Sequence, residues 1–354
     1  MKKYLLPQTG NFYKANLHAH TTVSDGEYSP EEVKKMYKEH GYCVVAFTDH
    51  HVMVPHLDLA DENFVPLIGW EMSFGEIDQE AIRRYGEDSP IVQKFYRRNC
   101  DICCISPSPD VLEQPCYHRT KHVAGFMEPW RAYVHFDENE PDFEKTFTPE
   151  CINEAIKRHV DRGFFVTYNH PGFSQANYTE YSKYHGMHAM EICNFGSSVT
   201  GWPDYNEKEY EDMLRGGERI YCIATDDNHN HSRSRENYPD DSFGGFTMIK
   251  AEKLEYETLI KAMKAGNMYA SQGPLIHELW LEDGKLHITC TDAERIVMST
   301  ASRRIGFAHN IDGSLINSAS FDVFPEDGYV RLTVTDAAGK HANTRAYFTD
   351  EILD

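Results

Sequence analysis

The strongest constraint on the fold of this chain is a repeated pattern, in which short apolar runs end in residues that can bind metal ions. Such runs cover residues 42–48, 65–70, 164–168, 187–193 and 220–225. They contain or precede the groups Asp49-His50-His51, Glu71, Asn169-His170-Pro171, Glu191 and Asp226-Asp227-Asn228-His229. Short buried strands that alternate with helices are typical of parallel βαβ units. In barrels built from such units, the functional residues lie at the carboxyl ends of the strands. The pattern therefore predicts an α/β barrel with a metal site at one end.

The first ligand-type element is His18-Ala-His20, which is followed by Ser24-Asp25-Gly26. Two histidines two residues apart on an extended strand point to the same face, so both rings can reach one ion. The carboxylate of Asp25 lies in a turn that can close back toward them. This motif alone fits two surface histidines equally well, but the recurrence at later strand ends favours a metal site.

Helix signals occur between several of these runs. Ser29-Pro30-Glu31-Glu32 combines an N-cap, a proline at the first helical position and a capping-box glutamate, and Gly41 ends the helix that it starts. Thr148-Pro149-Glu150 starts another helix, which Gly163 ends. The alternation of strands and helices supports the α/β class independently of the metal ligands.

The order HxHTxxSDG, TDH, GxE, HV, NHP and DxH resembles the PHP (polymerase and histidinol phosphatase) superfamily of metal-dependent phosphoesterases, over roughly residues 11–273. The resemblance implies a distorted seven-stranded (β/α) TIM-like barrel in residues 1–273. Carried over position by position, it implies the metal ligands His18, His20, Asp25, His50, Glu71, His122, His170, Asp227 and His229. His122 is assigned on the segment Lys121-His-Val-Ala-Gly-Phe, where it precedes an apolar run at 123–127 that is expected to form a strand, so an insertion at 74–121 must precede it. The DxH spacing favours Asp227 over its neighbour Asp226.

A mixed set of imidazoles and carboxylates suits Mn, Fe or Zn. Nine ligands are too many for one ion, so we expect two or three divalent ions, with Glu71 able to bridge two of them. The resemblance implies hydrolysis of a phosphomonoester or phosphodiester by a metal-bound hydroxide, held by His20, Glu71 and Asp227.

Two alternatives stay open. An amidohydrolase-like enzyme that cleaves C–O or C–N bonds also opens with HxH, but its pattern lacks the SDG turn and the TDH strand end. A non-catalytic metal-binding PHP module is the other alternative. Every motif here keeps its ligand residue, which favours the enzyme.

The formal net charge of −21 argues against general affinity for nucleic acid. It is compatible with a small phosphorylated substrate, because the metal ions add positive charge inside the site. Arg233 and Arg235 could contact such a substrate or could simply be solvated. Gly244-Gly245 lacks the context of a phosphate loop. Without a signal-like apolar run or a stretch of 18 apolar residues, we expect a cytoplasmic protein with no membrane partner; the oligomeric state is left open.

The insertion at 74–121 is long enough to be functional. We predict a helical lid over the metal site, with Arg97 or Arg98 contacting substrate; the alternative is a segment packed on the flank of the barrel. Cys100-x-x-Cys103 with Cys116-x-His118 could hold a structural zinc, although reduced thiols are the expectation.

The pattern changes after Gly273. Short alternating runs appear at 276–281, 285–290, 295–299, 318–323 and 329–335, and a last strand is expected at 341–348. Residues 274–354 are therefore predicted to form a small all-β, sandwich-like domain packed on the barrel.

Overall fold

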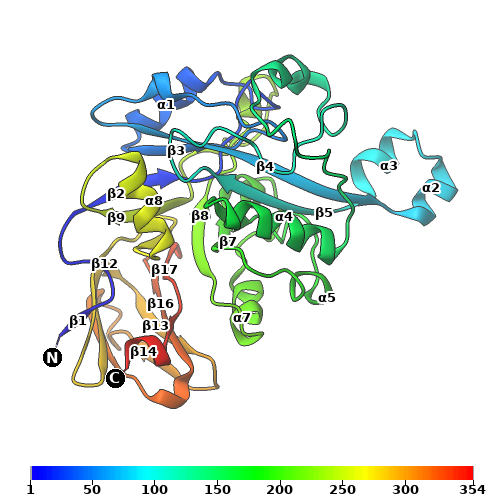
Figure 1. The fold of residues 1–354 in the computed structure, drawn as a ribbon. Coiled ribbons are helices and arrows are strands. Elements are labelled where there is room, and N and C mark those ends of the chain that lie inside the picture. The colour runs from blue at the N-terminus through cyan, green and yellow to red at the C-terminus, as the bar shows by residue number, and fades with distance from the viewer. Residues whose placement is uncertain (1, 354) are drawn as a thin grey trace.

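The computed structural model describes residues 2–353, except for the side chains of residues 93–95. It is a mixed α/β structure with one large mixed sheet and one small antiparallel sheet (Figure 1). The large sheet contains, in spatial order, β14 (Ile305–Ala308), β13 (Arg295–Thr300), β16 (Tyr329–Thr335), β17 (His341–Thr344), β10 (Met268–Ser271), β9 (Phe246–Ala251), β2 (Asn11–Asn16), β3 (Val44–Phe47), β4 (Val65–Ile77), β5 (Arg97–Ile105), β6 (Phe165–Tyr168), β7 (Ala189–Asn194) and β8 (Tyr221–Thr225), and β18 (Tyr347–Phe348) pairs with β16. The small sheet contains β1 (Lys3–Tyr4), β11 (Ile276–Glu282), β12 (Lys285–Ala293) and β15 (Ile316–Asp322).

The helices lie between and around these strands. They are α1 (Pro30–Glu39), α2 (Gln79–Tyr85), α3 (Pro90–Phe95), α4 (Pro149–Asp161), α5 (Tyr178–Tyr181), α6 (Phe195–Val199), α7 (Glu207–Arg215), α8 (Tyr256–Lys264) and α9 (Thr349–Ile352). Both predicted helix starts are confirmed: Ser29 caps α1 through a capping box with Glu32, and the side chain of Thr148 caps α4. Among the described residues, no helix is both long enough and apolar enough to span a membrane.

The central part of the large sheet carries the ligand-type residues. Strands β2, β3 and β4 run parallel, as do β6, β7 and β8, whereas β5 and β9 run antiparallel to their neighbours. The segments that follow β2 and β8 are joined by hydrogen bonds, from Asp227 N to His18 O at 3.0 Å and from His20 N to Asn228 O at 3.1 Å. The sheet therefore curls until the ends of β2 and β8 meet. The predicted α/β class is confirmed, with a sheet that is mixed and not uniformly parallel.

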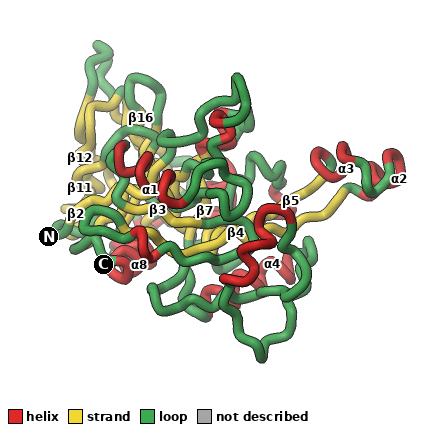
Figure 2. Tube along the Cα trace, turned by 90° about the horizontal axis from the view of Figure 1, so that it is seen from above, coloured by secondary structure: helices red, strands yellow, loops and turns green. Residues whose placement is uncertain are grey.

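The insertion forms an antiparallel arm and not a lid. β4 continues six residues past Glu71 and pairs with β5 as far as Ile77 and Arg97. This hairpin carries α2 and α3 at its tip, and both views show the tip projecting away from the rest of the molecule (Figures 1 and 2). The helices predicted for the insertion are present, but continuous strand pairing carries them away from the strand ends that they were expected to cover.

The C-terminal region is a two-layered β structure. β13, β14, β16 and β17 extend the large sheet through the pairing of β17 with β10, and the small sheet packs on them. Leu279 and Ile288 of the small sheet share a core with Met298 and Leu332 of the large one. The N-terminal strand β1 joins the small sheet by pairing with β11. Strands from both sides of the predicted domain boundary at 273/274 pair with each other, β10 with β17 and β1 with β11. The boundary therefore stays a prediction.

Candidate metal centre

The two histidines after β2 meet at one point, as predicted from their spacing. His18 Nε2 and His20 Nε2 lie 3.0 Å apart. Asp227 Oδ1, at the end of β8, lies 3.2 Å from the first nitrogen and 3.0 Å from the second. All three side chains are buried, and these ligand atoms are close enough to surround one ion.

Glu71 lies at the centre of the cluster. Its Oε1 is 3.4 Å from His18 Nε2 and 3.1 Å from His170 Nε2. Its Oε2 is 3.4 Å from His20 Nε2 and 2.9 Å from His50 Nδ1. Each oxygen of one carboxylate thus faces its own pair of imidazoles, which is the arrangement that a bridging ligand needs.

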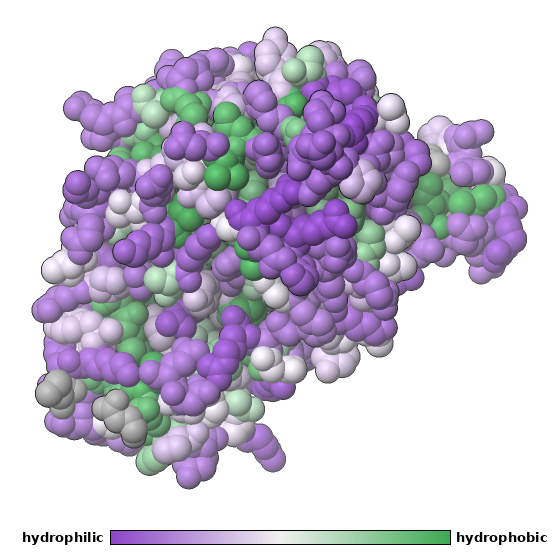
Figure 3. All heavy atoms as spheres, in the orientation of Figure 1, coloured by the Kyte–Doolittle hydropathy of each residue, from purple (hydrophilic) through white to green (hydrophobic). Residues whose placement is uncertain are grey.

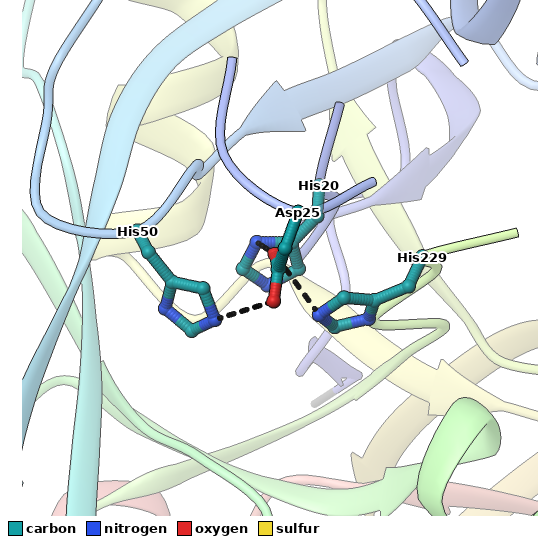
Figure 4. A group of neighbouring side chains, drawn as sticks. All are labelled: His20, Asp25, His50 and His229. Carbon is teal, nitrogen blue, oxygen red and sulfur yellow. Dashed lines mark ion pairs between the residues drawn. The ribbon is translucent and has the colours of Figure 1, made fainter. Parts of the chain in front are cut away.

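A further group of ligand atoms surrounds Asp25 (Figure 4). Asp25 Oδ2 lies 3.7 Å from His50 Nε2, and Asp25 Oδ1 lies 3.4 Å from His229 Nε2. His20 completes this group. Gly26 is needed for the turn, because a Cβ there would lie 2.6 Å from the carbonyl group of His20.

The backbone holds two ligand-type residues in the left-handed region, which is uncommon for residues other than glycine. Asp227 has a φ of 51° and His170 a φ of 28°. Neighbouring Asp226 points elsewhere: its carboxylate accepts hydrogen bonds from the backbone N–H groups of Phe243, Gly244 and Gly245. The preference for Asp227 over Asp226 agrees with this geometry. Gly244 and Gly245 bind a buried carboxylate of the protein itself.

Glu191 orients two of the histidines without pointing at the centre of the cluster. Its Oε1 lies 2.8 Å from His18 Nδ1 and accepts from the Thr225 hydroxyl at 2.7 Å. Its Oε2 accepts from the backbone N–H of His170 at 2.8 Å. A carboxylate at Nδ1 favours a proton there and leaves Nε2 of His18 free to bind a metal ion.

The donor set fits divalent ions. Asp101 Oδ1 is buried and has no hydrogen-bond partner in the described protein. Asp227 Oδ1 and His50 Nδ1 are buried and face only other ligand-type groups, the imidazoles of His18 and His20 and the carboxylate of Glu71. Buried polar atoms are normally fully paired, so this crowding of donor atoms fits a bound cation. Burial alone would lower the pKa of His170, but its hydrogen bond to Glu71 and the charge of Asp227 raise it to about 10. The carboxylates of Glu71 and Asp227 therefore stabilise positive charge in the cluster.

Two further ligand-type residues, Asp101 and Cys103, were not predicted. In the β4–β5 pairing, Cys103 lies opposite Glu71 and Asp101 lies opposite Ser73, so their side chains share the face of Glu71. Cys103 groups with His18 and Glu71, and Asp101 groups with Glu71 and His170. Period-two alternation within residues 97–105 could have revealed them, had the segment been recognised as a strand.

This placement contradicts the structural zinc site considered for the insertion. Cys100 and Cys103 are three residues apart on β5 and therefore face opposite sides of the strand. All the cysteines are free, and no group of described residues close enough to hold an ion contains Cys100, Cys116 or His118.

His122 lies apart from the other eight predicted ligands. Residues 123–127 form no strand, because the chain after β5 continues as a loop and a 3₁₀ helix from Gly125. The His122 ring packs beside His118, with ring centres 5.4 Å apart, next to a cavity of about 10 Å³ that His51 and Lys145 also line. Neither a hydrogen bond nor an ion pair links His122 to the cluster within residues 2–353. The strand prediction on which its assignment depended is wrong.

We expect Asp101→Asn to weaken metal binding by at least about tenfold and His122→Ala to leave it unchanged. Asp101 contributes an anionic oxygen beside Glu71 and His170, whereas His122 lies outside the cluster. Titration of each metal-free variant with Mn²⁺ against a competing chelator measures the difference. Weaker binding in His122→Ala than in Asp101→Asn would contradict this assignment.

A cavity of about 650 Å³ opens onto the cluster. Of the arginines that were candidates for substrate contact, Arg97 and Arg235 line it. Arg233 instead forms an ion pair with Glu32, and Arg98 forms one with Glu180.

No protein-family model and no curated protein sequence matches the chain. The solved structures that are similar to it include the following three. The first, from Bacteroides vulgatus, is described as a two-domain protein containing a predicted PHP-like metal-dependent phosphoesterase; the match covers 98% of both chains at 12% identity, with a TM-score of 0.41. The second, from Bifidobacterium adolescentis, is described as a candidate metal-dependent phosphoesterase and covers 66% of this chain and 91% of its own, at 15% identity and a TM-score of 0.38.

The third similar structure is an amidohydrolase from Chromobacterium violaceum with bound sulfate and no metal. It covers 64% of this chain and 92% of its own, at 16% identity and a TM-score of 0.39. All three TM-scores lie below 0.5, so these similarities carry no information on the function of the site.

Proposed function

We propose that this protein is a metal-dependent phosphoesterase that hydrolyses a small anionic phosphate ester. The observation that carries the proposal is the position of Glu71, whose two oxygens face two separate pairs of imidazoles at distances of 2.9–3.4 Å. A carboxylate placed in this way could hold two ions at the close spacing that two-metal hydrolases use.

The residues that would hold the ions fall into overlapping groups. His18, His20 and Asp227 form one, and His20, Asp25, His50 and His229 form another; Glu71, His170 and Asp101 form a third. This mixture of nitrogen and oxygen donors suits Mn, Fe or Zn. Ions of this kind lower the pKa of bound water and neutralise the charge that develops on phosphoryl oxygens.

The protein's own residues keep the ligands in place. The Asn169 amide donates to Glu71 Oε1 at 3.1 Å, and the Asn194 amide donates to Asp227 Oδ2 at 3.1 Å. These contacts fix the two carboxylates and leave Asp227 Oδ1 facing the ring nitrogens of His18 and His20. Because these ligands are already held in position, little free energy is needed to reorganise them when the reaction occurs.

The cavity also favours a small substrate. Its volume of about 650 Å³ is in the usual range for a small-molecule site. Arginine side chains at its wall match an anionic ligand, while the net charge of −21 disfavours a long nucleic acid.

Screening with phosphomonoesters, phosphodiesters, carboxylic esters and amides, each with Mn, Fe and Zn, tests the proposal. We expect turnover of phosphate esters that a chelator abolishes and added metal restores. Metal-dependent turnover confined to carboxylic esters or amides would replace the proposal by a C–O or C–N hydrolase. Stoichiometric metal binding without turnover of any class would indicate a non-catalytic module.

A further inference from the structure

The cavity extends from the cluster along the hairpin that carries the projecting arm. Asp101, Asn99 and Arg97 alternate along one face of β5 and line the cavity, and Ser73 lines it from β4. The base of the arm thus lines the cavity, while the helices at its tip project away from the rest of the molecule (Figure 2). A substrate bound at the cluster could therefore extend along this row and contact its polar side chains.

Arg97 stands at the outer end of the row. It is exposed, and no ion pair joins it to a carboxylate among residues 2–353. Its neighbour Arg98 faces the other side of the strand, where it forms an ion pair with Glu180 and lies over the ring of Phe147. Of these two adjacent arginines, Arg98 is paired with a carboxylate of the protein, whereas Arg97, which lines the cavity, is not.

Gly75 leaves the space that this arrangement needs. A Cβ at this position would lie 3.0 Å from an Nη atom of Arg97 and 3.2 Å from Asn99 Oδ1. Asn99 Oδ1 is itself buried without a hydrogen-bond partner. The side chains between the cluster and Arg97 are therefore polar and closely packed against Gly75, and Asn99 Oδ1 among them has no hydrogen-bond partner.

The spacing along β5 sets the length of ligand that fits. Arg97 and Asp101 are four residues apart, which corresponds to about 14 Å between their Cα atoms in an extended strand. Because the arginine side chain can reach back toward the cluster, a group bound by Arg97 would lie on the order of 7 to 14 Å from one held beside Asp101.

We propose that Arg97 binds a second anionic group of the substrate, so that the preferred substrate is a phosphate ester with another phosphate or carboxylate at this distance. This inference rests on the proposed function. A guanidinium group binds either anion through two parallel charge-assisted hydrogen bonds, so the shared chemistry is a terminal oxyanion.

The test measures binding by calorimetry on protein loaded with Mn²⁺. The ligands are propane, hexane and nonane chains that carry a phosphonate at both ends, each compared with the alkyl monophosphonate of equal length. We expect the hexane bisphosphonate to bind at least about tenfold more tightly than hexylphosphonate, as a charged hydrogen-bonded contact provides. Arg97→Gln should remove most of this difference and Arg97→Lys should keep part of it.

Arg98→Gln is the matched control, because it removes the same charge from the other face of the same strand. It should keep the full preference for the bisphosphonate. The proposal is overturned if the unmodified protein shows no preference, if Arg97→Gln keeps the preference, or if Arg98→Gln loses it equally. Circular dichroism and thermal melting of each variant verify folding. Turnover of the corresponding phosphate esters is measured separately, so a protein that binds them without hydrolysis would refute the proposed function and leave this inference standing.

Discussion

Replacing Asp227 by Asn should lower phosphatase turnover at least about a hundredfold, roughly 3 kcal/mol of activation free energy, while the protein stays folded. Asp227 Oδ1 is the buried oxygen that His18 and His20 share, at 3.2 and 3.0 Å. The asparagine amide has the same shape but no negative charge, so it is a weak ligand for a divalent ion. His20→Ala should have an effect of similar size, because His20 belongs to two of the ligand groups.

Steady-state kinetics at saturating metal, together with thermal melting of both variants, measures this effect. His122→Ala serves as the control, since that histidine lies outside the cluster. If activity falls only in parallel with loss of folding, the ions have a structural role and the catalytic assignment is wrong.

Replacing Arg331 by Met should lower the free energy of unfolding by about 3–5 kcal/mol. Arg331 is 1% exposed where β16 packs against α7. Its Nε lies 2.5 Å from Glu211 Oε1, and its Nη2 lies 2.5 Å from Glu207 Oε1. Removing the arginine would leave Glu211 Oε1 buried without its cation, because the remaining partners of Glu211, the half-exposed Arg215 at 2.7 Å and the Tyr329 hydroxyl, contact only Oε2. This partly uncompensated charge is the source of the cost.

Urea unfolding of three variants tests this explanation. The double variant Arg331→Met/Glu211→Leu should recover most of the loss, because no buried charge remains unpaired. Arg219→Met breaks exposed ion pairs to Asp350 and Glu351 and should cost less than about 1 kcal/mol. Equal losses in Arg331→Met and in the double variant would show that packing, and not charge, holds β16 against α7.

The ligand-type residues that follow β2, β3, β6 and β8, and Glu71 within β4, were predictable because local sequence motifs mark them. His18 and His20 form an HxH motif, His50 follows the apolar run at 42–48 after Asp49, and the curling of the sheet brings these residues together. The DxH spacing alone was enough to choose Asp227 over Asp226 as the predicted metal ligand. The structure adds the cause, which is the binding of Asp226 by the backbone of residues 243–245.

The path of the insertion was not predictable from local signals. Asp101 and Cys103 reach the cluster only because β5 pairs antiparallel with β4, and that register depends on contacts across the sheet. The prediction placed the returning strand at 123–127 and so assigned His122. It also missed the continuation of β4 past Glu71, which turns the expected lid into a projecting arm (Figure 1).

The C-terminal sandwich was predicted from alternation, but its continuity with the large sheet was not. Alternation in the sequence of β16 predicts one buried face, whereas the structure buries all of β16 and three of the four residues of β17. The alternation also does not show which strand each edge pairs with. The pairing of β17 with β10 joins the two parts. Polar side chains cover most of the face of the molecule seen in Figure 3.

The metal content of the purified protein tests the central claim most directly. The chain should be stripped with chelator, loaded with Mn, Fe or Zn, freed of excess metal and analysed for bound ions per chain. Glu71→Gln provides the matched variant, because it removes the charge that both pairs of imidazoles share. We predict at least two ions per chain for the unmodified protein, within about 4 Å of each other, and fewer for Glu71→Gln. Less than one ion per chain after loading, or equal occupancy in both proteins, would contradict a bridged multinuclear centre.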